Sequence, residues 1–256
     1  MKPPHVVAFG GGVDSTAMVI GLVQRNEPID LILFADTGGE RPETYNHLET
    51  FSKWLKERGY PGIITVWKVK DGERLTLEKD CIDHKGLPSI AYGFKRCSDH
   101  FKIRPQNTFL RNWQPAIDAW EAGLKVVKYI GYDAGETRRK ENADKRVDGK
   151  YDYRYPLIEW GWEREECLET IAAAGVPNPG KSACFFCPSS RPKEVVDLYE
   201  KHPNLLERAL QMEANADLRS IKGLGRQYAW KDVIWMHKAQ MDLPFGGFDK
   251  PCECTE

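Results

Sequence analysis

A glycine-rich segment near the start of the chain has the composition of a phosphate-binding loop. It consists of Gly10, Gly11 and Gly12, and it is followed by Asp14, Ser15 and Thr16. Glycine lets the backbone approach an anion closely, and the amides at a helix start attract negative charge. The sequence lacks the lysine of a Walker A loop and the spacing of a dinucleotide fingerprint. We predict a phosphate cradle, with a tight strand–helix turn capped by Asp14 or Ser15 as the alternative.

Cysteine pairs in the second half of the chain could hold a metal. The chain has seven cysteines, and two residues separate Cys184 from Cys187. At that spacing two thiolates can bind one metal ion or cluster. Cys252 and Cys254 offer further thiolates near the end of the sequence. A [4Fe–4S] cluster is the favoured interpretation, and Zn²⁺, a redox dithiol or two small buried side chains are the alternatives.

The order of apolar and amphipathic segments predicts the framework that positions these groups. Strands are expected at residues 5–9, 30–35, 62–67 and 126–131, with helices at 17–23 and 44–56. Strands alternating with helices through short loops are typical of an α/β fold with a doubly wound, mainly parallel sheet. Such a sheet binds its ligand where the strand order reverses, beyond the carboxyl ends of the strands.

An aspartate follows the second expected strand, at the edge where such a ligand binds. Asp36 could bind Mg²⁺, which takes few carboxylates together with phosphate oxygens and water. The alternative is a turn that Asp36 begins and that Thr37 and Gly38 complete. Position alone does not separate these two interpretations.

Length and composition restrict the class of protein. The 256 residues carry a net charge of −1, which excludes a general nucleic-acid coat protein. No apolar run approaches the roughly 20 residues of a membrane span, and residues 1–5 lack the apolar core of a secretory signal. A cytoplasmic protein is expected, with a nucleotide-binding core over residues 1–160. Residues 161–256 are expected to form a helical region with the CxxC loop, a helix at 162–174 and a mobile tail from 244.

Four motifs occur in the order found in one known family. Residues 10–15 resemble the S-G-G-x-D-S loop of the PP-loop adenine-nucleotide α-hydrolases. Residues 36–44 resemble the D-T-G-x-x-x-P-E-T segment of their phosphoadenylyl-sulfate (PAPS) reductase branch, and residues 96–105 its C-x-x-x-x-K-x-x-P stretch. Residues 131–139 are similar to its G-x-R-x-x-E-S-x-x-R region, and residues 155–157 to the P-L that follows.

This resemblance implies roles for individual residues. Asp14 and Ser15 would act in catalysis, and Cys97 would join Cys184, Cys187 and Cys252 as metal ligands. The implied nucleotide contacts are Gly10, Gly11, Gly12, Asp14, Ser15, Thr16, Asp36, Thr37, Gly38, Lys102, Gly131 and Arg138. Gly10 departs from the family pattern, because it replaces the first serine of the loop and removes one hydroxyl donor.

The resemblance also implies a reaction. An enzyme of this class would cleave ATP with Mg²⁺ to AMP and pyrophosphate and adenylate an acceptor. An iron–sulfur cluster would then assist sulfur transfer to tRNA, DNA or a small molecule. The first alternative is a PAPS or adenylyl-sulfate reductase that uses Cys254 and thioredoxin, supported by the tail pair Glu253-Cys254. The second is a non-catalytic nucleotide-binding module, and a homo-oligomer remains open.

Overall fold

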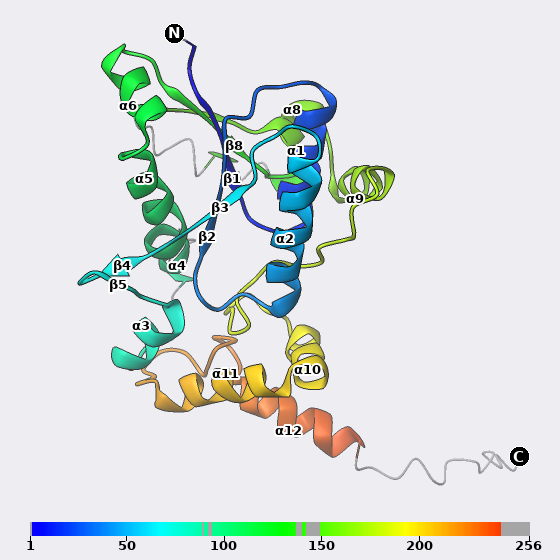
Figure 1. The fold of residues 1–256 in the computed structure, drawn as a ribbon. Coiled ribbons are helices and arrows are strands. Elements are labelled where there is room, and N and C mark those ends of the chain that lie inside the picture. Colours follow the sequence, from blue (N-terminus) through cyan, green and yellow to red (C-terminus); the bar gives the residue numbers. More distant parts are fainter. Residues whose placement is uncertain (1, 89, 92–93, 137–139, 142–148, 242–256) are drawn as a thin grey trace, which may run out of the picture. The chain divides into compact units, whose positions relative to one another are not determined.

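The computed structural model describes the chain except residues 1, 89, 92–93, 137–139, 142–148 and 242–256 (Figure 1). It contains two compact units, each described separately below. The first unit comprises residues 1–80 and 88–184, and the second comprises residues 81–87 and 185–256. The expected boundary at residue 160 therefore lies within the first unit.

A parallel sheet forms the centre of the first unit and confirms the predicted α/β fold. Its strands follow the order β3-β2-β1-β8-β9, and every neighbouring pair is parallel. They are β1 (His5–Phe9), β2 (Leu31–Asp36), β3 (Ile63–Trp67), β8 (Val126–Ile130) and β9 (Tyr151–Arg154). The sequence predicted four of them and missed β9, an edge strand in which buried and exposed side chains alternate.

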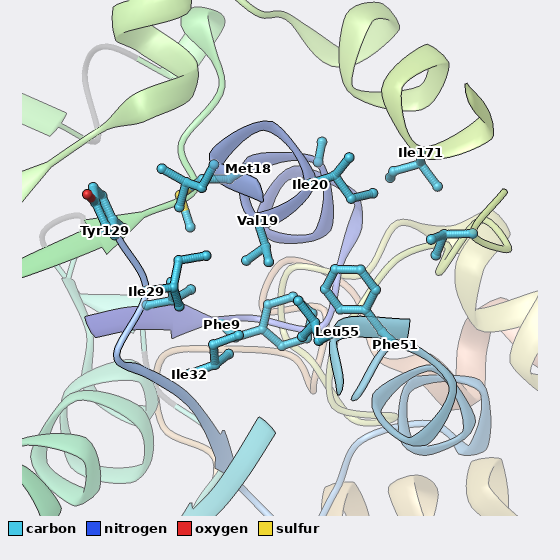
Figure 2. Close-up of a cluster of buried hydrophobic side chains, with 14 of the residues drawn as sticks. Phe9, Met18, Val19, Ile20, Ile29, Ile32, Phe51, Leu55, Tyr129 and Ile171 are labelled. Atoms are coloured by element: carbon cyan, nitrogen blue, oxygen red, sulfur yellow. The ribbon is translucent and has the colours of Figure 1, made fainter. Parts of the chain in front are cut away.

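Helices cover both faces of the sheet, because alternate strand residues point to opposite sides. One face packs against α1 (Val13–Gln24) and α2 (Pro42–Lys56), and Figure 2 shows Phe9 and Ile32 pointing toward these helices. The helices α8 (Pro156–Trp160) and α9 (Arg164–Ala173) complete this side. The other face packs against α5 (Arg104–Leu110) and α6 (Gln114–Glu121).

Helix α9 belongs to the first unit because it packs along α1. Its side chains Cys167 and Ile171 are 0% and 1% exposed and join the core beneath α1. Cys167 is therefore a core residue. Burial raises the pKa of its thiol to about 12, so that Cys167 is a neutral apolar group at physiological pH.

Short elements connect the third strand to α5. They are the hairpin strands β4 (Val69–Lys70), β5 (Glu73–Arg74), β6 (Ile90–Ala91) and β7 (Phe94–Lys95), and the helices α3 (Leu77–Asp83) and α4 (Arg96–Ser98). A π-helical turn, η1 (Asp99–Ile103), leads into α5, and a 3₁₀ turn, η2 (Ala134–Glu136), follows β8. Single π-helical turns often occur at functional sites.

The described part of the second unit is largely helical, as expected, and includes α10 (Pro192–Lys201), α11 (Pro203–Asn215) and α12 (Trp230–Met241). Its buried carboxylate Glu213 accepts backbone N–H groups from Leu224 at 2.7 Å and Trp230 at 2.9 Å. Glu213 therefore ties the loop before α12 to α11. No helix in the described ranges has the length and apolarity needed to cross a membrane.

A buried lysine lies in the centre of the sheet. Lys128 on β8 is 3% exposed, and its Nζ donates to Oδ1 of Asn107 at 3.2 Å. Burial lowers the pKa of Lys128 from its ordinary 10.5 to about 8. A charged Lys128 is therefore destabilising, since burial of an ammonium group costs free energy.

We predict that this cost appears as a pH dependence of stability. Between pH 8 and 10.5 the unfolded chain holds the Lys128 proton and the folded chain does not, so that the free energy of unfolding rises with pH. Relative to Lys128→Met, the wild type should gain about 2–3 kcal/mol across this window. Urea unfolding at several pH values measures the difference, with the exposed Lys125→Met as control. A wild type–variant difference that is independent of pH would contradict the assignment.

Candidate nucleotide-binding site

The glycine loop lies where the strand order of the sheet reverses. Strand β1 pairs with β2 on one side and with β8 on the other, and the chain passes from β1 through α1 to β2. The crevice beyond β1 and β8 is therefore the switch point at which an open parallel sheet binds ligands. Gly10, Gly11 and Gly12 occupy the end of β1 at this crevice.

Backbone groups rather than side chains form the start of α1. The N-cap residue is Gly12, and no side chain in the described part of the chain caps the helix. The hydroxyls of Ser15 and Thr16 instead donate to the Gly12 carbonyl oxygen, at 3.1 and 2.8 Å. The alternative of a cap by Asp14 or Ser15 is therefore wrong. The first-turn amides point outward at the positive end of the helix dipole, an arrangement suited to an anion.

Two glycines allow the backbone to pack this closely. Gly11 has a φ of 74°, the left-handed region that favours glycine. Gly131, directly after β8, lies against the first turn of α1. A Cβ at Gly131 would come within 2.9 Å of the Ser15 Cα and 3.0 Å of its nitrogen. The two predicted motif residues Gly131 and Ser15 are thus in contact.

A buried histidine supports the loop from the core side. Thr16 is fully buried, and its Oγ1 lies 2.8 Å from the Gly12 carbonyl oxygen and 2.9 Å from Nε2 of His47. The Thr16 proton goes to Gly12, so His47 must donate through Nε2. Burial lowers the pKa of His47 to about 4, which keeps the ring neutral. Thr16 therefore positions the loop, and His47 is a supporting residue that the sequence did not indicate.

Two further groups contact the loop from distant parts of the sequence. Nη1 of Arg164 lies 2.8 Å from Oδ1 of Asp14, and this guanidinium is about half exposed. The Ser182 hydroxyl donates to the Gly10 carbonyl oxygen. A guanidinium has five N–H donors, so Arg164 can bind a phosphate while it is paired with Asp14. No motif in the sequence marked Arg164 or Ser182.

The aspartate at the end of β2 begins a turn. Oδ1 of Asp36 accepts the Gly38 N–H at 2.7 Å and the Tyr45 hydroxyl at 3.0 Å. Its Oδ2 accepts from Nη2 of Arg74 at 2.6 Å. Burial, followed by the nearby Asp36 carboxylate, raises the pKa of Tyr45, which remains a donor. Both Asp36 oxygens accept hydrogen bonds from the protein, and the Gly38 N–H bond agrees with the turn interpretation.

A buried carboxylate follows in the same segment. The Glu40 side chain is 0% exposed, and its Oε1 accepts from Nζ of Lys102 at 3.2 Å. The Cys184 thiol lies 4.0 Å from the same oxygen and 3.0 Å from the Thr37 hydroxyl. Lys102, predicted to bind an anion of the ligand, is thus paired with a protein carboxylate. Thr37, predicted to contact the nucleotide, is buried against Cys184.

The predicted metal ligands are only partly described. Cys97 in α4 and Cys184 belong to the first unit, and Cys187 belongs to the second. Cys252, Cys254 and Arg138 lie outside the described residues. Within the described ranges, no three His, Cys, Asp or Glu side chains form a group that could hold a metal ion. We therefore derive no step through a cluster.

A parallel sheet with a glycine loop and an uncapped helix at its switch point is the arrangement typical of α/β proteins that bind nucleotides. Residues 4–164 match the phosphoadenosine phosphosulfate reductase domain family. Because the match covers more than half of the chain, the protein belongs to this family, as the four motifs predicted.

Two further similarities were found. An uncharacterized protein of Methanocaldococcus jannaschii is 25% identical over 257 residues, which cover 94% of this chain and 47% of that protein. The chain thus spans about half the length of this relative. A solved structure of the U34-tRNA thiolase NcsA from Methanococcus maripaludis, with its [4Fe-4S] cluster, has a TM-score of 0.43 and 15% identity. The similarity covers 89% of this chain and 77% of that chain.

We predict that the contact between Gly131 and Ser15 is required for nucleotide binding. Gly131→Ala places a methyl group against backbone, so the loop must move, and affinity for an ATP analogue should fall about tenfold or more. The control is Gly149→Ala, whose Cβ would meet no atom within 4 Å and which lies outside the glycine loop. Calorimetric titration measures affinity, and thermal unfolding verifies the fold. Equal affinity of both variants would contradict the assigned site.

Proposed function

We propose that the protein is a PP-loop enzyme that binds an adenine nucleotide and acts at its α-phosphate. The observation that carries the proposal is the uncapped start of α1 at the switch point, with Gly131 packed against Ser15. Such a site offers several amides to an extended anion such as pyrophosphate. Membership of the phosphoadenosine phosphosulfate reductase domain family supports an adenine nucleotide as the ligand.

The proposed reaction is adenylation. An oxygen of the acceptor bonds to the α-phosphorus of ATP, the bond to the bridging oxygen breaks, and pyrophosphate leaves. The loop amides and the Arg164 guanidinium would stabilise the charge that develops on the leaving group. Asp14 would orient Arg164, since the two groups are 2.8 Å apart. Catalysis by this chain would thus consist of positioning and charge neutralisation.

A sulfonucleotide reductase is the second candidate. The family match and the Glu253-Cys254 pair favour it. The Cys254 sulfur would attack the sulfate sulfur of PAPS or adenylyl sulfate and release the nucleotide. Reduced thioredoxin would then displace sulfite and become oxidised. Both candidates use the same loop, and they differ in the bond that breaks.

Two methylene analogues of ATP separate the proposed cleavage from ordinary ATP hydrolysis. An enzyme that cuts between the α and β phosphates should release AMP from β,γ-methylene-ATP and leave α,β-methylene-ATP intact. We expect this pattern with Mg²⁺ and total RNA or a small-molecule extract as the acceptor, measured by chromatography. Asp14→Asn should lower the rate about 10- to 100-fold, because Arg164 loses its orienting partner.

The opposite pattern, with ADP and orthophosphate as products, would contradict cleavage at the α-phosphate. Sulfite release from PAPS with thioredoxin, abolished by Cys254→Ser, would establish the reductase instead. Nucleotide binding without any product would support the non-catalytic module.

The predicted cluster ligands are Cys97, Cys184, Cys187 and Cys252, and this set can be tested without turnover. Anaerobically purified protein should contain iron and sulfide and absorb broadly near 400 nm, at about the position of thiolate-bound clusters. Cys184→Ser should lose most of the iron and the band, whereas Cys167→Ser, in the apolar core, should keep both. Colourless protein loaded with zinc would replace the cluster by a zinc site.

A further inference from the structure

A second cavity lies beside the edge strand β3. It has a volume of about 460 Å³ between the end of β3 and the start of α5, within the first unit. This volume lies in the range of roughly 300–1,000 Å³ that is typical of small-ligand sites. Its lining includes Trp67, Lys68, His100, Arg104 and Phe109, and none of its lining residues is acidic.

The cavity combines cations with an aromatic surface. Trp67 is 42% exposed and lines the cavity. Lys68 and Arg104 supply positive charge, and each also has one acidic partner, Asp80 at 3.8 Å and Asp99 at 2.8 Å. Neither carboxylate lines the cavity. Proteins that bind single-stranded nucleic acids combine positive charge, which attracts the phosphates, with aromatic side chains on which the bases stack.

The titration behaviour of His100 agrees with a positive cavity. Burial lowers the pKa of His100, and the positive charges of Arg104, Arg96 and Lys68 lower it further, while Asp99 opposes them. Together, the charged neighbours of His100 therefore make the electrostatic potential at its ring more positive. Such a potential favours the phosphate of a bound nucleotide.

The cavity lies on the same edge of the sheet as the glycine loop. Trp67 pairs in register with Asp36 on β2, so both lie at the carboxyl edge of the sheet. The Arg74 guanidinium donates to Oδ2 of Asp36 at 2.6 Å and lies 5.3 Å from the centre of the Trp67 ring. Because neighbouring strands are about 4.8 Å apart, the end of β3 lies roughly 10 Å from the end of β1.

We propose that this cavity binds one nucleotide of a single-stranded nucleic acid, with the base on Trp67 and a phosphate near Lys68 and Arg104. The proposal rests on the proposed function in one respect, since it identifies the adenylated acceptor as a single strand. A duplex does not enter a cavity of this size, so the strand binds through an unpaired base. Arg74 then connects the bound base to the end of β2 beside the glycine loop.

The experiment measures binding of a fluorescent single strand of about 12 nucleotides by anisotropy, because single-strand sites span about 4–16 nucleotides. Trp67→Ala should weaken binding about 5- to 100-fold, the contribution of one stacked base. Arg104→Gln should reduce the slope of log K against log salt by about 0.7, the contribution of one phosphate contact. The controls are Trp235→Ala, an exposed tryptophan of the second unit, and Arg58→Gln, a surface arginine of the first.

The same variants are titrated with α,β-methylene-ATP, which should bind unchanged. If Trp67→Ala weakens this analogue instead, the cavity holds the adenine of ATP and the proposal is wrong. The proposal is also wrong if the wild type does not bind the nucleic-acid strand at low salt. It is wrong as well if Trp67→Ala and Trp235→Ala bind that strand with equal affinity, the result expected if the edge of β3 instead binds a β-strand of another protein. ATP cleavage without strand binding refutes the cavity alone, whereas strand binding without ATP cleavage refutes the proposed function alone.

Discussion

The close approach of two backbones at the switch point is the constraint on which the rest of the site depends. Gly131 after β8 touches Ser15 in the first turn of α1. This contact requires β1 and β8 to be parallel neighbours and requires a residue without a side chain at position 131. It holds the start of α1 at the carboxyl edge of the sheet, where its amides face the crevice. The predicted phosphate cradle therefore depends on backbone packing, and the side chains around it stabilise that packing.

Three carboxylates along this edge are each paired with a cation. Asp14 pairs with Arg164 at 2.8 Å, Asp36 with Arg74 at 2.6 Å and Glu40 with Lys102 at 3.2 Å. Three uncompensated carboxylates would repel a nucleotide, and two of these, Asp36 and Glu40, are almost fully buried. Pairing offsets part of the desolvation cost of these carboxylates and holds three cations beside the crevice. The basic groups of this edge are therefore already positioned before an anion arrives.

Local patterns in the sequence predicted the framework and the loop. The apolar runs at 5–9 and 126–131 predicted central strands because buried parallel strands are continuously hydrophobic. The glycines predicted the cradle, since a triple glycine has few structural uses. Strand β9 was missed because Tyr151–Arg154 mixes aromatic and charged residues, as an edge strand allows.

Contacts between distant residues could not be predicted in the same way. Arg164 is 150 residues from Asp14, and Ser182 is 172 residues from Gly10, so no local spacing encodes either pair. The alternative of a side-chain cap for α1 was wrong. The Ser15 hydroxyl can either accept a hydrogen bond from an amide N–H or donate one to a carbonyl oxygen, and its place in the sequence does not say which. Only the local geometry, with Gly12 as N-cap, decides between them. The roles of Arg138, Cys252 and Cys254 stay predictions.

The glycine loop and the cavity beside β3 lie on one edge of the sheet, which suits the proposed reaction at an α-phosphate. In a parallel sheet all carboxyl ends lie on one side, so that the ends of β1 and β3 face the same solvent-filled edge. A nucleotide held at β1 and an acceptor held at β3 would therefore approach each other over the end of β2. The Asp36–Arg74 pair lies at that position, and Arg74 also contacts Trp67. The pair is thus placed to orient both reactants, because a shift of the acceptor base would move the guanidinium that neutralises Asp36.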